Sequence, residues 1–204
     1  MKATKGDTKM KTKTINVYSV NELSDKAKQR AFEKWCQEDD YPWNEENSKA
    51  LRKFEEIFPV DVRDFEYGYR KNIDWKYTGE ENIGELNGSR LATYIQNHYG
   101  SALFRPKYIG HLEGKPKFTP VYSRVQKENS CVLTGYYIDN SILGPIYEFL
   151  KKPTNTTFKD LLGDCLESWL SACENDYEGY FSLESFLDHA EANEYEFDVD
   201  GNRI

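Results

Sequence analysis

Two aspartates and a lysine, Asp61, Asp74 and Lys76, have the types and spacing closest to a catalytic pattern. Two carboxylates can hold Mg²⁺ while a lysine lies near the attacking water, which is the chemistry of a metal-dependent nuclease. The pattern runs Pro59-Val60-Asp61, then Asp74-Trp75-Lys76, with one extra residue between the proline and the first aspartate. The alternating exposed face of a β-hairpin would give the same residues. A small nuclease, or another nucleic-acid enzyme, therefore stays an alternative, and no catalytic residue is assigned.

Asp160, Asp164 and Glu167 lie at spacings of four and three, on one face of a predicted helix. Acid-base catalysis by such carboxylates requires burial that raises one pKa. Acids with scarcely a base nearby more often form a solvated or partner-facing surface. The four cysteines contain no Cys-x-x-Cys pair, and the three histidines lie far from them in the sequence. We therefore expect no metal site and no cofactor.

The acids are concentrated at one end of the chain. Residues 160–204 contain thirteen acids and one base, which leaves a net charge of −12, whereas the whole chain is −8 and residues 1–13 are +4. The acidic segment also contains Trp169, Tyr177, Phe186 and further aromatic residues. A solvated acidic tail lacks such apolar material, so we expect a folded acidic surface that favours a basic partner.

A basic groove that binds nucleic acid is one such partner, because helical carboxylates three or four residues apart can imitate a row of phosphates. Aromatic residues among the acids would anchor the contact. The alternative is that Tyr177, Tyr180 and Phe181 close a loop over the core. An acidic-aromatic segment near residue 40 extends the predicted surface if folding brings it near. The predicted partner-binding residues are Glu174, Asp176, Tyr177, Glu178, Tyr180, Phe181, Glu38, Asp39, Asp40 and Trp43.

Two stretches resemble phage- or prophage-encoded small acidic accessory proteins. One is Leu23-Ser24-x-x-Ala27-Lys28-x-x-Ala31-x-x-x-Trp35; the other is Ser182-x-x-Ser185-Phe186 with Glu194-Tyr195-Glu196-Phe197-x-x-Asp200-Gly201. That group includes inhibitors of host defence, anti-CRISPR proteins among them. The resemblance implies an inhibitor that acts by binding, with a host nuclease or CRISPR effector as partner in the bacterial cytoplasm. A structural or regulatory phage protein without a defence role is the remaining alternative.

Periodicity and capping residues predict the elements that carry these side chains. We expect helices over 24–36, 47–58, 89–99, 142–152 and from 157 past 173, and a short helix capped by Ser182. Residues 60–78 alternate as an aromatic β-hairpin, and 15–20, 131–138 and 194–199 have strand composition. Gly100 is expected to close the third helix. The fold class is α+β, an aromatic antiparallel sheet packed with five to six helices.

We expect a flexible basic lead at 1–13, an α+β region at 14–138 and a helical acidic region at 139–204, packed as one unit. No apolar run is long enough to span a membrane and no secretory signal is evident, so a membrane partner is not expected. Direct nucleic-acid binding is disfavoured by the net charge. Residues 105–127 are locally +5, which leaves open a homodimer in which this stretch contacts the acidic face of a second copy.

Overall fold

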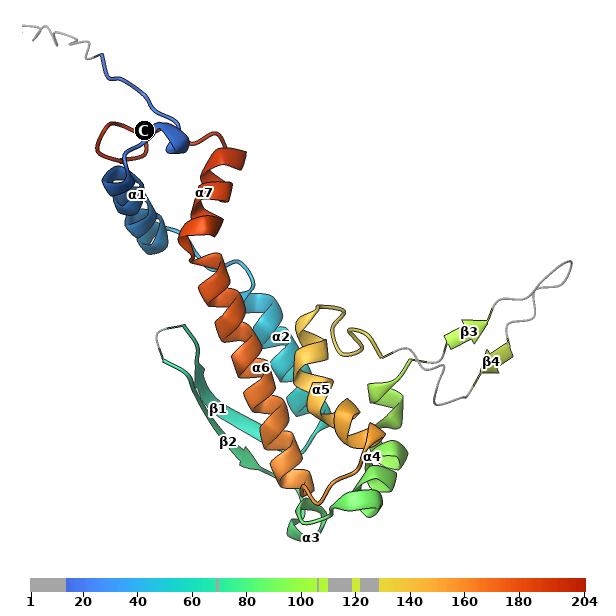
Figure 1. The fold of residues 1–204 in the computed structure, drawn as a ribbon. Helices are drawn as coiled ribbons and strands as arrows, with labels where there is room; N and C mark the ends of the chain where they lie inside the picture. The colour runs from blue at the N-terminus through green and yellow to red at the C-terminus, as the bar shows by residue number, and fades with distance from the viewer. Residues whose placement is uncertain (1–13, 69, 106, 110–118, 122–128) are drawn as a thin grey trace, which may run out of the picture. The chain divides into compact units, whose positions relative to one another are not determined.

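The computed structural model describes residues 14–68, 70–105, 107–109, 119–121 and 129–204. The fold is α+β, as predicted: the described chain contains helices and a two-stranded antiparallel hairpin (Figure 1). The chain forms two compact units. The central unit is Tyr41–Glu178, and the terminal unit combines the segment ending at Asp40 with Gly179–Ile204. These units differ from the expected ranges 14–138 and 139–204, and the expected basic lead at 1–13 lies outside the described residues.

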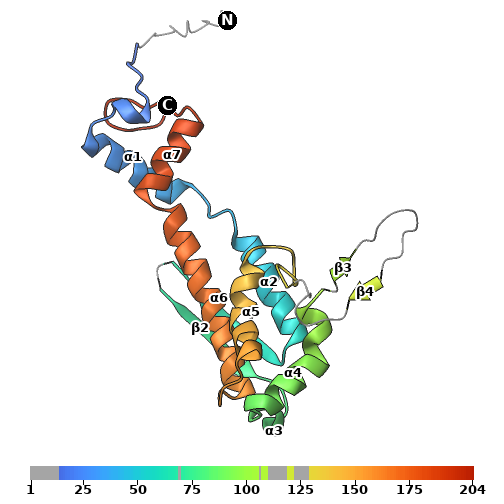
Figure 2. The same ribbon diagram turned by 45° about the vertical axis from the view of Figure 1, so that its right-hand side comes forward.

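Four long helices build the central unit: α2 (Asn44–Ile57), α4 (Gly88–Leu103), α5 (Ile138–Lys151) and α6 (Phe158–Tyr180). In Figure 1 and Figure 2, α2 and α5 lie side by side. Their shared core includes Phe54, Ile142 and Trp169, all fully buried. The indole nitrogen of Trp169 donates to the carbonyl of Asn47 at 3.2 Å. Burial of these large side chains is the main force that holds α6 in place.

The predicted hairpin is present as β1 (Val60–Glu66) and β2 (Asn72–Tyr77). Its inner face contacts α6: the ring of Phe65 packs edge-on against the ring of Trp169, with 5.0 Å between their centroids. A single-turn helix, α3 (Glu81–Gly84), follows the hairpin. Two further strands, β3 (Lys107–Ile109) and β4 (Thr119–Val121), pair antiparallel. Most of the basic stretch from 105 to 127 lies outside the described residues.

The predicted strand at 131–138 is wrong, because a buried carboxylate organises this segment as a loop. Asp139 is fully buried, with 0% of its surface exposed. One of its oxygens accepts from the backbone N–H groups of Leu133, Thr134 and Gly135 at 3.0, 2.7 and 3.0 Å. The other oxygen accepts from the Thr134 hydroxyl at 2.7 Å. These bonds turn the chain directly into α5, which begins four residues earlier than expected.

The terminal unit consists of η1 (Val20–Glu22), α1 (Asp25–Glu38), α7 (Leu183–Ala192) and the segment that follows α7. Ser24 and Ser182 cap α1 and α7 as predicted: their hydroxyls accept from Ala27 N and Ser185 N at 3.3 and 3.1 Å. The core of this unit includes Trp35, Phe186 and Phe197.

Three other predictions about elements are wrong. The segments 15–20 and 194–199 form no full strands: Tyr18 and Phe197 pair in one isolated bridge, and Phe197 pairs in a second one with Arg203. Gly100 lies inside α4, which continues to Leu103, because Leu103 is buried and extends the apolar side of the helix. Tyr177 and Tyr180, expected between two helices, lie in the last turn of α6.

Candidate functional site: an acidic helix face and a pocket

One side of α6 carries carboxylates, opposite the side that packs in the core. We call Asp160, Asp164, Glu167, Glu174 and Glu178 the acidic face; their spacings of four, three, seven and four place them along one line on a helix of 3.6 residues per turn. Glu174 is half-buried and the other four are exposed. The buried residues of α6, among them Leu162, Cys165 and Trp169, project from the opposite side. The acidic face is therefore a consequence of an amphipathic helix.

Few bases neutralise this face. Lys71, at the turn of the hairpin, lies 3.2 Å from Glu174 and also donates to the Ser171 hydroxyl at 2.7 Å. None of the other four carboxylates has a lysine or arginine nitrogen within 4.0 Å in the part of the chain that the structure describes. Partial burial, together with the charge of Asp160, raises the pKa of Asp164 above its ordinary value. A raised pKa is expected where carboxylates adjoin without a compensating cation.

The carboxylates are more widely spaced than phosphates. From Asp160 to Glu178 the helix rises about 27 Å at 1.5 Å per residue. Over the same length one strand of a DNA duplex presents roughly eight phosphates, at 3.4 Å each. Five carboxylates therefore supply about two thirds of the charge of one strand. The face can replace some of the phosphates that a basic groove contacts.

Tyr177, one of the aromatic residues predicted to anchor this surface, packs against other residues of the central unit. Tyr177 contacts the rings of Tyr41 and Tyr67 at 5.4 and 6.3 Å between centroids. It also lies against Gly68 of the hairpin. Asp176 points away from the acidic face, because it is two residues from Glu174 and Glu178 on the same helix. Trp43, which precedes α2, is more accessible, with 47% of its surface exposed.

The remaining predicted contact residues belong to the terminal unit, so the predicted surface is divided between the two units. Glu38, Asp39 and Asp40 lie at the end of α1. The Tyr180 hydroxyl donates to the Asp39 carboxylate, and burial raises the pKa of Tyr180 to about 12. Tyr180 and Phe181 pack against Trp35 at 5.2 and 5.5 Å between centroids. Both aromatic side chains thus hold the terminal unit together.

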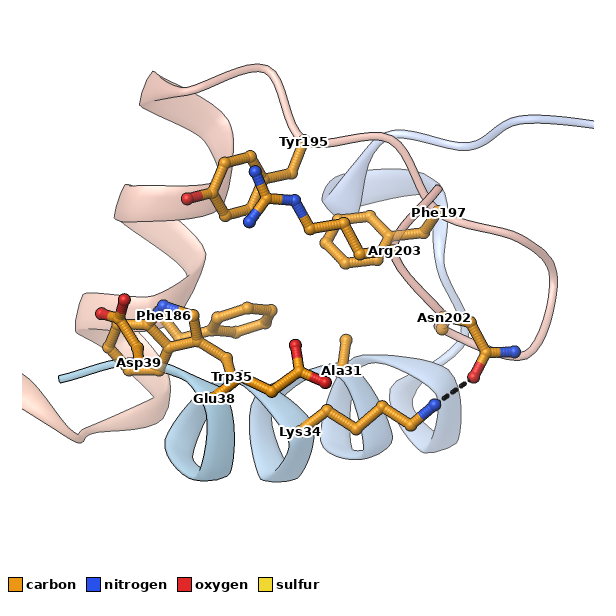
Figure 3. A pocket seen from close by; sticks show the side chains of 11 residues that line it. Ala31, Lys34, Trp35, Glu38, Asp39, Phe186, Tyr195, Phe197, Asn202 and Arg203 are labelled. Atoms are coloured by element: carbon orange, nitrogen blue, oxygen red, sulfur yellow. Dashed lines mark hydrogen bonds between the residues drawn. The ribbon is translucent and has the colours of Figure 1, made fainter.

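A pocket of about 300 Å³ lies in the terminal unit, between α1 and the segment that follows α7 (Figure 3). Ala31, Lys34, Trp35 and Glu38 form one wall, because spacings of three and four residues place them on one side of α1. Tyr195 and Arg203 lie across the pocket from this helix (Figure 3). The other lining residues are Asp39, Phe186, Phe197, Gly201 and Asn202.

A tight turn brings the end of the chain against α1. The carboxylate of Asp198 accepts from the backbone N–H groups of Asp200 and Asn202, each at 2.9 Å, and from the Asn202 side-chain amide at 2.7 Å. The bonds from Asn202 and Asp200 lower the pKa of Asp198. Gly201 has a φ of +84°, and a Cβ at this position would clash with the carbonyl of Ala27. Only glycine permits both this conformation and this approach.

The pocket combines aromatic walls with charges of both signs. The guanidinium carbon of Arg203 lies over the Tyr195 ring, 3.4 Å from its centroid, and Lys34 donates to the Asn202 side chain. Trp35 is buried, and its indole nitrogen has no hydrogen-bond partner among the residues that the structure describes. Sequence reasoning identified Glu38 and Asp39 but did not predict the pocket. The available signals were the glycine of the Asp200-Gly201 turn and the lone base, Arg203, in an acidic segment.

The residues of the nuclease alternative are paired with bases across the hairpin. Asp61 is opposite Lys76 in the strand register, and their side chains are 3.2 Å apart. Asp74 lies 3.8 Å from Arg63. The described residues contain no group of three or more His, Cys, Asp or Glu side chains placed to hold a metal ion. The geometry at these residues is that of a hairpin's outer face, with cross-strand ion pairs.

Comparisons with models of protein families, with curated proteins and with solved structures found no significant match. None of the helices in the described ranges has the length and apolar character needed to cross a bilayer.

Proposed function

We propose that this chain is an interaction protein that binds a basic, nucleic-acid-handling partner through the acidic face of α6 and inhibits it by occupying its phosphate-binding groove. The observation that supports this proposal is the line of five carboxylates opposite the buried side of α6, with Lys71 as the one base within 4.0 Å in the described part of the chain. The helix backbone holds these charges in a fixed row before binding, so complex formation costs little conformational entropy of this chain.

The finer expectation is an anti-defence role in the bacterial cytoplasm, with a host nuclease or CRISPR effector as the target. It rests on the charge pattern and on the sequence resemblance described above. The aromatic residues near Glu178 contribute by fixing the end of α6, since Tyr177 packs on the hairpin. Binding energy then comes mainly from charge, and the association rate should fall steeply with ionic strength.

The test compares two triple variants in a competition assay. Asp160→Asn, Asp164→Asn and Glu167→Gln together neutralise three of the four carboxylates of the acidic face that have no nearby base among the described residues. The control replaces three other exposed acids, Glu80, Glu81 and Glu85, by glutamine and so removes the same charge around α3.

The immobilised protein is exposed to bacterial nucleic-acid-binding proteins, with and without competing duplex DNA. We expect retained proteins to be displaced by DNA and by raised salt, and to be lost with the α6 variant but kept with the control. Equal retention by the two triple variants, or retention that DNA does not affect, would contradict the proposal.

A further inference from the structure

We propose that the pocket of the terminal unit binds a small zwitterion of the amino-acid type that has an apolar side chain. The pocket lies entirely within the terminal unit, whereas the acidic face lies in the central unit. This proposal therefore does not depend on the proposed function. A volume of about 300 Å³ is at the lower end of the range for small-molecule sites.

The apolar part of the ligand is specified by the aromatic walls. The ring of Phe186 is tilted by 44° to that of Trp35 and by 72° to that of Phe197. Tyr195 is tilted by 65° to Phe197. These ring pairs are far from parallel, so the walls form a cup and not a slot for a flat ring system. A compact side chain such as that of leucine fits this shape better than a fused heterocycle.

The charges of the residues that line the pocket indicate which charges the ligand carries. Lys34 and Arg203 oppose Glu38 and Asp39, so the lining is neutral. The described part of the terminal unit as a whole has thirteen acids and five bases, a net charge of −8. Two of those five bases thus line the pocket. A cation would find stronger attraction elsewhere on this unit, whereas a dipolar ligand matches both signs.

The pocket also contains polar groups that lack partners. The Trp35 N–H is buried and has no acceptor in the described part of the chain, and Figure 3 shows its nitrogen on the ring edge toward Tyr195. Glu38 and Arg203 form no ion pair with any other described residue. The guanidinium stacked on Tyr195 keeps its edge N–H groups available to a carboxylate. A ligand carboxylate would accept from Arg203 and Trp35, and a ligand ammonium would donate to Glu38.

The test uses L-leucine as the probe, with two analogues that each lack one charge. Leucinamide has no carboxylate, and 4-methylpentanoate has no ammonium group. Binding to the full chain is followed by NMR, through the indole N–H resonance of Trp35. We expect leucine to shift this resonance saturably, with a Kd below about 1 mM. Each analogue should bind about tenfold or more weakly, because each loses charge-assisted hydrogen bonds.

Variants assign the two charges to residues. Glu38→Gln and Arg203→Gln should each weaken leucine binding about tenfold or more. Glu33→Gln is the matched control, since this exposed glutamate lies on α1 outside the pocket lining, and it should leave the Kd unchanged. A Trp35 resonance that does not move, analogues that bind as tightly as leucine, or an equal effect of Glu33→Gln and Glu38→Gln would each overturn the proposal. None of these outcomes would affect binding through α6.

Discussion

The buried carboxylate of Asp139 allows a quantitative prediction about the stability of the central unit. It accepts four hydrogen bonds, three of them from the backbone of the loop that leads into α5. A hydrogen bond contributes about 1 kcal/mol net, and more where one partner is charged. Asp139→Ala removes both oxygens that accept these four bonds, and it leaves the loop N–H groups without a partner. We expect it to lower the free energy of unfolding by about 3–5 kcal/mol.

Asp139→Asn should cost less, about 1–2 kcal/mol. The three backbone donors share one carboxylate oxygen, Oδ2, whereas the Thr134 hydroxyl meets Oδ1. An asparagine can place its carbonyl oxygen at the first position and its amide at the second, where the hydroxyl rotates to accept. All four bonds then persist, but they are no longer assisted by a charge.

Urea unfolding followed by far-ultraviolet circular dichroism measures both changes, with an unchanged slope as the criterion for comparison. Glu148→Ala is the control on the same helix, because Glu148 forms an exposed ion pair with Lys151. It should change the free energy of unfolding by no more than about 0.5 kcal/mol. An Asp139→Ala protein within about 1 kcal/mol of the wild type would refute the reasoning. The loop would then be energetically uncoupled from the core.

Gly201→Ala should destabilise the terminal unit by at least about 2 kcal/mol, because it adds a clash to an unfavourable φ. Urea unfolding monitored by Trp35 fluorescence measures this change. The control, Gly179→Ala, should be neutral or stabilising in the same assay, because the space around its Cβ is open. Burial raises the thiol pKa values of Cys165 and Cys173. A thiol reagent at neutral pH should therefore modify them only after denaturant is added. Rapid labelling of these two cysteines in the native protein would disprove their burial. Burial raises the pKa of Tyr180 to about 12, so its contribution to stability is complete below about pH 10 and is lost as the pH rises through the folded value. Tyr180→Phe should therefore reduce the alkaline loss of unfolding free energy, and identical pH profiles for the two proteins would contradict the assignment.

Elements specified by neighbouring residues could be predicted from the sequence. The Thr157 hydroxyl donates to the Asp160 carboxylate at 2.7 Å and accepts from the Asp160 N–H at 3.2 Å, so the expected start of α6 is confirmed. The caps at Ser24 and Ser182 are confirmed for the same reason, since each involves residues three apart. The acidic face is similarly local, because it follows from the helical repeat once α6 is identified.

Elements that depend on contacts outside these capping and helical spacings were not predictable in this way. The segment near Tyr18 has strand composition, but it meets Phe197 only through two backbone hydrogen bonds of 2.8 and 2.9 Å, and Phe197 in turn forms a single bridge with Arg203. The loop before α5 contains apolar residues that suggest a strand, yet a carboxylate four to six residues further on captures its N–H groups. The pocket joins Ala31 to Arg203, which no local pattern relates.

The aromatic residues among the acids show why composition alone does not separate surface aromatic residues from those that pack inside the fold. A tyrosine ring has an apolar body and a polar tip, so it suits both an interface and the edge of a core. For Tyr180 the deciding contact is with Asp39, 141 positions away in the chain. That contact uses one of the carboxylates expected to face a partner, and the ring packs on Trp35. An acid beside an aromatic residue is therefore evidence for a binding surface only when the acid has no donor within its own fold. Among the described residues, the four carboxylates of α6 that have no nearby base come closest to that condition.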